Sequence, residues 1–246
     1  MEDIIIGRNP VIEAINSGRS INKILVAENS KGPQYQKLTQ MAKDAGVILN
    51  FVPRKKIDGI VEGQHQGVVA YVAAYQYAEL DDLFEVAKSK NEDPFFIILD
   101  ELEDPHNLGS IMRTADAVGA HGIIIPKRRS VGLTSTVAKA STGAIEYVKV
   151  ARVTNLAQTI DQLKEKGLWV FGTDASAKED YQYMDGTLPL ALIIGSEGRG
   201  ISKLVLSKCD FKVKLPMKGK VTSLNASVAA SILMYEVFRK RLAKGE

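Results

Sequence analysis

Short apolar runs alternate with segments of helical spacing from residue 94 to the end of the chain. The runs are FFIILDE, HGIIIP, EYVKVARV, LWVFGTD, LALIIG and FKVKLP, and the segments between them include GSIMRTADAVG, NLAQTIDQLKEKG and GISKLVLSKCD. Strands that are apolar at consecutive positions are buried on both faces, which is typical of a mostly parallel sheet covered by helices on both sides. The alternation therefore predicts an α/β fold.

A smaller alternating unit precedes this one. DIIIG, INKILVAE, VILNFVP and GVVAYVAAY are candidate strands, and NPVIEAINSG, GPQYQKLTQMAKDAG and part of RKKIDGIVEG are candidate helices. Pro10 and Gly18 stand where a helix usually begins and ends. The polar helical segment ELDDLFEVAKSKNEDP follows. We therefore expect an N-terminal domain over 1–77, a linker and lead-in helix over 78–93, and a second domain over 94–246.

Composition narrows the class of protein. The chain has 246 residues, one cysteine and three histidines, so it predicts neither a disulfide framework nor a zinc site, and no metal is expected. The sequence has no run of about 18 apolar residues, so no membrane span is predicted. The start, MEDIIIGRNP, lacks the features of a signal peptide. We expect a cytoplasmic protein that does not contact a membrane.

The formal net charge is only +3, so any contact with RNA or DNA must come from local basic clusters. Such clusters occur at RKK, KRR and the C-terminal RKR. The alternative for each cluster is an ordinary solvated surface, which is where most lysines and arginines lie. The candidate RNA-binding residues are Arg8, Arg54, Lys55, Lys56, Lys127 and Arg128.

Three polar segments follow apolar strands, where ligands bind in open α/β sheets. In the first, DELEDPHNLGSIMRTADAVGA, Asn107 is placed to cap a helix and Arg113 lies six residues further on. An arginine among small residues near a helix start is suited to a phosphate. Alternatively, Asn107 is only a cap and Arg113 a surface residue.

The second segment is LALIIGSEGRGIS. Gly195 and Gly200 have the spacing of a phosphate-binding loop, but Ile201 stands where that loop requires lysine, so the motif fails. What remains is a glycine-rich turn around Glu197. Its backbone could approach a ligand closely, and a simple tight turn is the alternative.

The third segment is LPMKGKVTSLNASVAASILMYEVFRKR. Ser223 or Asn225 is expected to begin the last helix. Leu224, Val228, Ile232 and Tyr235 follow at helical spacing and are expected to face a core. A second apolar stripe, Ala229, Leu233 and Val237, suggests a dimer contact, although it could also cover the sheet.

These three segments, in this order and at these distances, resemble the three motifs of the SpoU (TrmH-type) branch of the SPOUT methyltransferases, over roughly residues 94–246. The first 75 or so residues resemble the small RNA-binding domain of rRNA-modifying members. The RlmB-type 23S rRNA guanosine 2′-O-methyltransferases share this two-domain plan. The resemblance implies a C-terminal SPOUT domain with a parallel sheet and a deep trefoil knot, and a small N-terminal L30e-like α/β domain.

The resemblance also implies an activity. It is the transfer of a methyl group from S-adenosyl-L-methionine (S-adenosylmethionine) to a ribose 2′-oxygen of RNA. The most similar members of the family imply a guanosine of 23S rRNA as the target. The family also implies a homodimer joined through the knotted domain. The implied cofactor-binding residues are Gly195, Gly198, Leu215, Met217, Leu224 and Ala226. The implied catalytic residues are Asn107, Arg113, Glu197, Ser223 and Asn225.

Arg113 is expected to stabilise the developing oxyanion, because a guanidinium stays protonated in proteins. Whether it also acts as the base stays open, and His106 is a weaker candidate for that role. Three alternatives stay open for the whole protein: a tRNA 2′-O-methyltransferase, a thiostrepton-resistance-type rRNA adenosine methyltransferase, and a non-catalytic RNA-binding or ribosome assembly protein.

Overall fold

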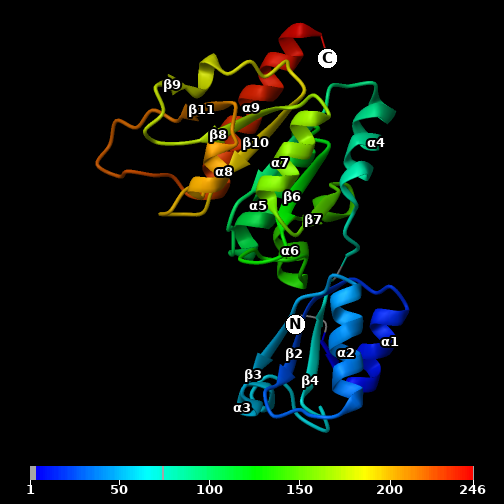
Figure 1. Cartoon of the computed structure of the whole chain (residues 1–246). Helices are drawn as coiled ribbons and strands as arrows, with labels where there is room; N and C mark the ends of the chain where they lie inside the picture. The colour runs from blue at the N-terminus through cyan, green and yellow to red at the C-terminus, as the bar shows by residue number, and fades with distance from the viewer. Residues whose placement is uncertain (1–3, 74, 246) are drawn as a thin grey trace. The chain divides into compact units, whose positions relative to one another are not determined.

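The computed structural model describes residues 4–73 and 75–245. The chain divides into two compact units, with the main boundary between Gln76 and Tyr77 and the short segment 132–136 grouped with the first unit (Figure 1). Each unit has its own sheet and its own apolar core. The alternating pattern of the sequence therefore belongs to two sheets rather than to one.

The N-terminal unit contains a four-stranded mixed sheet in the order β1-β4-β2-β3. Strand β4 is antiparallel to both β1 and β2, whereas β2 and β3 are parallel. Helices α1 and α2 pack on one face, and α3 packs on the other through Ile57. The elements are β1 (Ile4–Ile6), α1 (Arg8–Asn16), β2 (Ile21–Ala27), α2 (Pro33–Asp44), β3 (Leu49–Val52), α3 (Arg54–Asp58) and β4 (Val68–Val72).

The second unit contains a seven-stranded sheet in the order β7-β6-β5-β10-β8-β11-β9, and all of its strand pairs are parallel. Every residue of the central strands β5 and β10 is buried. The predicted parallel sheet is confirmed. The strands are β5 (Phe95–Leu99), β6 (Gly122–Pro126), β7 (Val150–Val153), β8 (Trp169–Thr173), β9 (Glu179–Asp180), β10 (Leu190–Ile194) and β11 (Phe211–Lys214).

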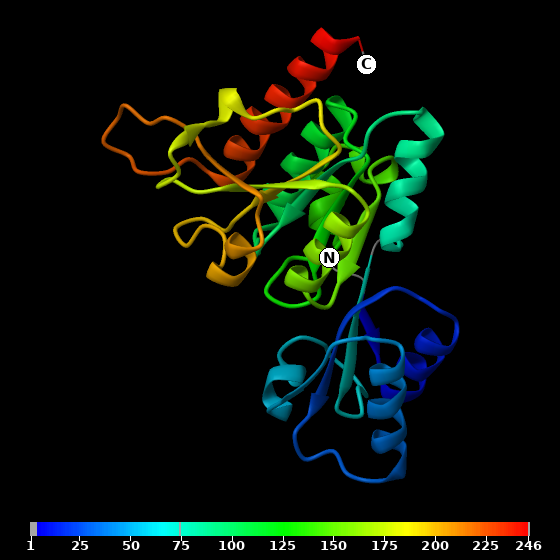
Figure 2. The ribbon, with the colours of Figure 1, turned by 45° about the horizontal axis from the view of Figure 1, so that its top comes forward.

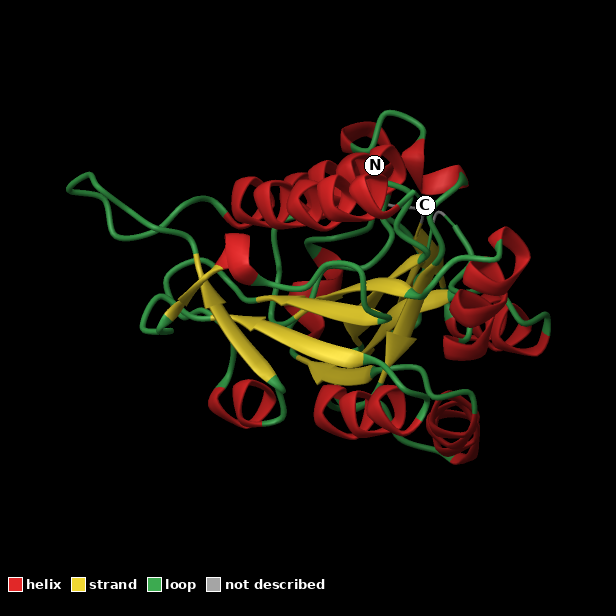
Figure 3. Ribbon diagram, turned by 90° about the horizontal axis from the view of Figure 1, so that it is seen from above, coloured by secondary structure: helices red, strands yellow, loops and turns green. Residues whose placement is uncertain are grey.

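Helices cover both faces of this sheet (Figure 3). On one face, α4 (Leu80–Lys90), α7 (Leu156–Glu165) and α8 (Lys203–Ser207) contribute to one apolar core. On the other face, α5 (Pro105–Ala117) packs along α9 (Ala226–Lys244) (Figure 2). The remaining short helices are α6 (Ser135–Ala140), η1 (Ala144–Glu146) and η2 (Tyr181–Tyr183).

Residues 78–93, expected to form a linker and lead-in helix, contain α4. Leu83 of this helix is fully buried, and a Cβ added to Gly122 of β6 would lie 2.3 Å from the Leu83 Cγ. Ala78 also forms an isolated parallel bridge with Ala151, beside β7. This segment therefore packs as part of the second unit.

The last helix presents a different face to the core from the one expected. Val228 is 46% exposed and Tyr235 is 51% exposed, so the expectation that these two residues face a core is wrong. Leu242, further along the helix, is 56% exposed. The buried residues of α9 are Ala226, Ala230, Leu233, Met234, Glu236, Val237 and Arg241.

The physical reason is the packing of α9 on α5. The side chains of Ala226 and Ala230 are small and buried, which permits the two helices to approach closely. At their contact, the hydroxyl oxygens of Thr114 and Ser231 lie 2.9 Å apart, within hydrogen-bond distance. The bulkier stripe through Val228 and Tyr235 is consequently turned outward.

Among the residues that the structure describes, no helix is long and apolar enough to cross a membrane. The same part of the chain holds no group of three or more side chains that could bind a metal ion.

Candidate functional site

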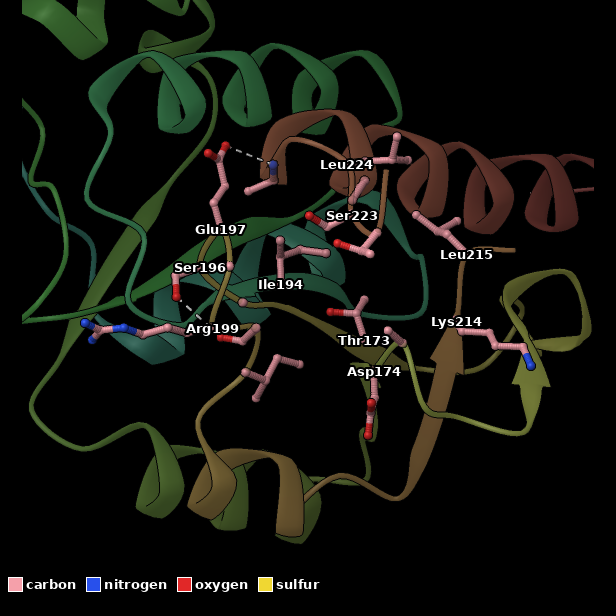
Figure 4. A pocket seen from close by; sticks show the side chains of 18 of the residues that line it. Thr173, Asp174, Ile194, Ser196, Glu197, Arg199, Lys214, Leu215, Ser223 and Leu224 are labelled. Carbon is pink, nitrogen blue, oxygen red and sulfur yellow. Dashed lines mark hydrogen bonds between the residues drawn. The ribbon is translucent and has the colours of Figure 1, made fainter. Parts of the chain in front are cut away.

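A cavity of about 530 Å³ lies beyond the carboxyl ends of β8, β10 and β11 (Figure 4). One wall is the turn after β10, a second is the segment after β8, and a third is the long connection from β11 to α9. Ile194, Leu215 and Leu224 give this cavity apolar surface, whereas Thr173, Asp174 and Ser223 give it polar groups. Such a mixture, at this volume, is typical of a small-molecule site.

The cavity brings together residues that the sequence had placed in separate motifs. All six predicted cofactor-binding residues line it, as do Glu197 and Ser223 from the predicted catalytic set. The six are Gly195, Gly198, Leu215, Met217, Leu224 and Ala226. A single space therefore collects the predicted cofactor residues of the second and third motifs.

The turn after β10 is closed by two backbone hydrogen bonds. The Ser196 N–H donates to the Gly200 carbonyl at 3.1 Å, and the Gly200 N–H donates back to the Ser196 carbonyl at 2.9 Å. A Cβ added to Gly195 would lie 2.1 Å from the Gly200 carbonyl carbon. Glycine is thus required at 195 because the turn folds back on itself, a reason different from the close ligand approach that the sequence suggested.

A hydrogen-bonded cluster joins all three motifs through Glu197. Its Oε1 accepts from the Asn107 Nδ2 at 3.0 Å, the Asn225 Nδ2 at 2.6 Å and the Ala226 N–H at 3.3 Å. The Asn225 Nδ2 also donates to the Asn107 Oδ1 at 2.9 Å. In Figure 4 the Glu197 side chain accordingly points to the start of α9. The carboxylate ties the turn after β10 to the first turn of α5 and to α9.

Asn107 can take part in this cluster because another residue caps helix α5. Asp104, not Asn107, caps α5: its Oδ1 accepts from the His106 N–H at 2.8 Å. The expectation that Asn107 is the cap is therefore wrong, because the cap position lies three residues earlier and Asn107 stands inside the first turn. Its side chain is buried against Glu197. Asn225 does cap α9, since its Oδ1 accepts from the backbone N–H groups of Ser227 and Val228.

The sequence analysis missed two polar residues of the cavity, Thr173 and Asp174. Hydrogen bonds from the backbone N–H and the hydroxyl of Ser176 hold the pKa of the Asp174 carboxyl below its usual value, so the carboxylate stays ionised at neutral pH. Both residues end the predicted strand LWVFGTD. The rule that ligands bind at the carboxyl ends of parallel strands would have found them.

A second cavity, of about 540 Å³, lies across the turn from the first. Ser196, Glu197 and Arg199 line both cavities, and Asn107 lines the second. The other residues of the second cavity are Glu101, Leu102, Glu103, Asp104 and Arg129. The cluster around Glu197 thus stands at the wall between two spaces of similar size.

Arg113 is not brought into either space. It is exposed on α5, lines neither cavity, and makes no hydrogen bond to any residue within 4–73 or 75–245. His106 is also exposed, and its backbone N–H is held by the Asp104 cap. Among the predicted catalytic residues, the structure therefore gathers Asn107, Glu197 and Asn225, with Ser223 at the first cavity.

The candidate RNA-binding residues lie in both units. Arg54, Lys55 and Lys56 are exposed on α3, and Arg54 has only a long 4.0 Å contact to Asp58. The guanidinium carbon of Arg8 lies 5.4 Å from the centroid of a tyrosine ring on α2, at Tyr35.

In the second unit, Lys127 follows β6 and is partly buried, and Arg128 is exposed beside it. The Lys127 carbonyl accepts from the Arg152 guanidinium at 3.1 Å. These two residues stand at the carboxyl end of the sheet.

Both units match known protein families. Residues 94–235 match the SpoU rRNA Methylase family, and residues 4–78 match the family described as RNA 2′-O ribose methyltransferase substrate binding. A Bacillus subtilis (strain 168) protein, YacO, is named provisionally as a TrmH family tRNA/rRNA methyltransferase. It is 67% identical over 244 residues, which are 99% of this chain and 98% of that protein.

Solved structures agree with these matches. The SpoU methyltransferase AviRb from Streptomyces viridochromogenes, in complex with S-adenosylmethionine, is 27% identical with a TM-score of 0.63, over 98% of this chain and 91% of its own. An S-adenosylmethionine-bound rRNA methyltransferase from Sinorhizobium meliloti is 26% identical with a TM-score of 0.60, over 96% and 86%. The A. aeolicus TrmH/SpoU tRNA modifying enzyme is 27% identical with a TM-score of 0.58, but over 67% of this chain and 85% of its own.

The first cavity fits S-adenosylmethionine, which is the cofactor. Leu215 and Leu224 offer apolar surface to a purine, Thr173 and Ser223 offer hydroxyl groups, and the ionised Asp174 suits a cationic group. When bound, this cofactor supplies a methyl group on a sulfonium. The two family matches, the relative at 67% identity and the fit of the cavity lead to one conclusion: this chain belongs to the SpoU family of RNA 2′-O-ribose methyltransferases.

Proposed function

We propose that this protein methylates the ribose 2′-oxygen of a guanosine in 23S rRNA. The observation that carries the choice of rRNA is the N-terminal unit. The rRNA methyltransferase from S. meliloti covers 96% of this chain, whereas the tRNA modifying enzyme from A. aeolicus covers 67%. A protein named an rRNA methyltransferase that aligns with both units of this chain favours rRNA as the substrate here.

The residues around Glu197 supply positioning for this reaction. A 2′-hydroxyl is a weak nucleophile and must lose its proton while negative charge develops on its oxygen. Asn107, Glu197 and Asn225 hold the turn after β10 against α5 and α9, and this fixes both cavities relative to each other. The Ser223 hydroxyl, exposed at the first cavity, is available to the ribose.

Arg113 supplies the cation in this proposal. Its guanidinium is solvated and uncommitted among the described residues, on the same helix as Asn107. It would bind the phosphate beside the target ribose and stabilise the oxyanion, and it would reach the site only when RNA or a second subunit is present. That requirement explains why it lines neither cavity in the single chain.

The proposal includes a homodimer joined through the second unit. Val228, Tyr235 and Leu242 are exposed at seven-residue intervals on α9, so they form one apolar stripe along the helix. Such a stripe is normally buried in a partner. The trefoil knot implied by the resemblance belongs to the same proposal. Its support is that segments 194–201 and 213–224, which are separate in the sequence, form opposite walls of one cavity.

The N-terminal unit acts in this proposal as an RNA-capturing arm over residues 1–77, followed by the lead-in segment 78–93 and the methyltransferase unit over 94–246. Arg8, Arg54, Lys55 and Lys56 would contact RNA from the arm, and Lys127 and Arg128 from the methyltransferase unit. We place the protein in the cytoplasm, where rRNA is modified.

Two other substrates and one other class remain as rival proposals. A tRNA substrate is disfavoured by the presence of the N-terminal unit. A resistance-type rRNA adenosine methyltransferase would share both units. A non-catalytic RNA-binding protein is disfavoured because Asn107, Glu197 and Asn225 are all present and hydrogen-bonded together.

One experiment separates these proposals. The purified protein is incubated with radiolabelled S-adenosylmethionine and, separately, with unmodified transcripts of 23S rRNA, 16S rRNA and tRNA. Resistance to alkaline hydrolysis then maps any 2′-O-methyl group. We expect one site in 23S rRNA. Methylation of tRNA alone, or of no RNA, would refute the proposal, and Leu224→Asp serves as the cofactor-free control.

A further inference from the structure

The second cavity adjoins the reaction centre without belonging to the cofactor site. It shares the wall of Ser196, Glu197 and Arg199 with the cofactor cavity and is also lined by Asn107. In Figure 4, the Arg199 side chain extends away from the cofactor cavity. A group bound in the second cavity would therefore lie across a single turn of chain from the methyl donor. In an enzyme that acts on a ribose, the base of the same nucleotide must occupy a space next to the reacting oxygen.

The charges of this cavity exclude some groups and favour others. Glu101, Glu103, Asp104 and Glu197 contribute four carboxyl groups, against the two guanidinium groups of Arg129 and Arg199. A phosphate within this space would be repelled by the excess of carboxylates. Ionised carboxylates only accept hydrogen bonds, so the cavity favours a group that is rich in N–H donors. Of the parts of an RNA nucleotide, only the base has such donors.

Three of the four carboxyl groups already have partners. Glu101 accepts from the Arg129 guanidinium at 2.8 Å. Asp104 caps α5, and Glu197 accepts the three bonds of the cluster. Glu103 is exposed, and no residue in the described part of the chain hydrogen-bonds to its carboxylate. The Arg129 guanidinium attracts this carboxylate electrostatically, but both carboxylate oxygens are without a hydrogen bond among the described residues.

Among the four RNA bases, guanine alone has two adjacent donors, N1–H and the N2 amino group, on its Watson–Crick edge. A carboxylate can accept both in parallel, in the bidentate arrangement that makes charge-assisted pairs strong. Cytosine and adenine each present one amino group beside an acceptor, and uracil presents one N–H between two carbonyls. Enzymes that act on single nucleotides read this edge after the base has left its stack.

We infer that the second cavity receives the guanine base of the target nucleotide and that Glu103 reads its Watson–Crick edge. This inference rests on the proposed function, because it assigns the base specificity of that same site. Arg199, exposed on the shared wall and without a hydrogen-bond partner among the described side chains, would lie beside the incoming nucleotide.

Binding of single nucleotides tests the cavity without any need for methylation. The full-length protein, saturated with S-adenosylhomocysteine, is titrated with guanosine, inosine, adenosine, cytidine and uridine 5′-monophosphates, and affinities are measured by saturation-transfer NMR. Inosine monophosphate lacks only the N2 amino group, so we expect it to bind about tenfold more weakly than guanosine monophosphate. Glu103→Gln should abolish this preference. The matched control is Glu165→Gln, which changes an exposed carboxylate at the end of α7.

The methylated product gives the second readout. The proteins are incubated with unmodified 23S rRNA transcript, and the modified nucleoside is identified by mass spectrometry. We expect 2′-O-methylguanosine, and a turnover at least about tenfold lower for Glu103→Gln with an unchanged affinity for S-adenosylmethionine.

The outcomes separate the two claims. A 2′-O-methyl group on the ribose of a nucleotide other than guanosine, or a guanosine preference that survives Glu103→Gln, would overturn the inference and leave RNA methylation standing. A preference for guanosine monophosphate that depends on Glu103, without methylation of any RNA, would support the cavity assignment and defeat the proposed function.

Discussion

Replacing Glu197 by alanine tests the cluster that joins the three motifs. The substitution removes three acceptor contacts, to the Asn107 Nδ2, the Asn225 Nδ2 and the Ala226 N–H. Asn107 is only 5% exposed, so water replaces its lost partner only in part, and this costs about 1–3 kcal/mol. Asn225 is exposed and can be resolvated, so its share is about 0.5–1 kcal/mol. The expected loss is therefore about 1.5–4 kcal/mol.

Two measurements follow from this magnitude. Thermal unfolding monitored by circular dichroism should show a Tm lower by about 3–16 °C, at about 2–4 °C per kcal/mol for a unit of this size. Calorimetry should show weaker binding of S-adenosylmethionine, because Glu197 lines its cavity. Binding should weaken by at most about 700-fold in Kd, the limit reached if all of the lost free energy falls on the bound state. Glu165→Ala, on the exposed end of α7, should change stability by less than about 0.5 kcal/mol.

A double-mutant cycle decides whether the cluster acts as a unit. Asn107→Ala and Glu197→Ala should show a coupling of about 1 kcal/mol or more, since the two side chains contact each other. If the two losses simply add to within about 0.3 kcal/mol, the hydrogen bond does not carry the stability assigned to it, and the reasoning is refuted.

Four further predictions concern the reaction, the cofactor, the RNA and the pH dependence. Arg113→Ala should leave the Kd of S-adenosylmethionine within a few-fold but lower single-turnover methylation by about a hundredfold or more; near-normal turnover would remove Arg113 from the site. Leu224→Asp should abolish binding of S-adenosylmethionine in calorimetry, because a carboxylate is costly against a purine, and normal binding by a protein with a native circular dichroism spectrum would contradict this. Deletion of residues 1–77 should leave a folded protein that binds the cofactor but methylates dilute rRNA poorly, with partial rescue at high RNA concentration and a weaker salt dependence of RNA binding; full activity at low RNA would argue against a capturing arm. Burial lowers the pKa of His121 in the folded state, so the unfolded chain binds a proton more readily and the free energy of unfolding should fall as the pH drops below about 6.5. Urea titrations at several pH values should show that the free energy of unfolding of His121→Gln depends less steeply on pH; an unchanged dependence would exclude His121 as the cause.

Much of the fold was predictable because it follows from local patterns of apolar residues. Continuous apolar runs such as FFIIL and LALII predicted buried parallel strands, and both are fully buried at the centre of the sheet. The antiparallel pairing of β4 in the N-terminal unit was not predicted. Its sequence, VVAYV, is as apolar as that of a parallel strand, and strand direction depends on connections rather than on composition.

The orientation of side chains was less predictable. The last helix carries two apolar stripes, and only its contact with α5 decides that Val228 and Tyr235 face outward. Asn107 has the sequence context of a helix cap, but Asp104 three residues earlier takes that role. In both cases two local solutions are nearly equivalent in the sequence, and tertiary packing selects one of them.

The candidate site was predicted mainly as a set of residues, not as an arrangement. The residues expected at the cofactor do line one cavity, yet the bonds through Glu197 join residues far apart in the sequence and leave no local pattern. The second cavity escaped prediction for the same reason. Glu101 and Arg129 carry no motif, and only the fold brings their side chains within 2.8 Å.

The hydrogen bond between Asn107 and Asn225 spans 118 residues of chain, which has a consequence for biosynthesis. A ribosome that adds about 5–20 residues per second needs about 6–24 s to pass from one asparagine to the other. Through that interval the nascent chain has no complete cofactor site. The four strands of the N-terminal sheet, in contrast, are all synthesised once Val72 has been added. The growing polypeptide thus acquires its N-terminal unit well before the residues of the second unit can form the cofactor cavity.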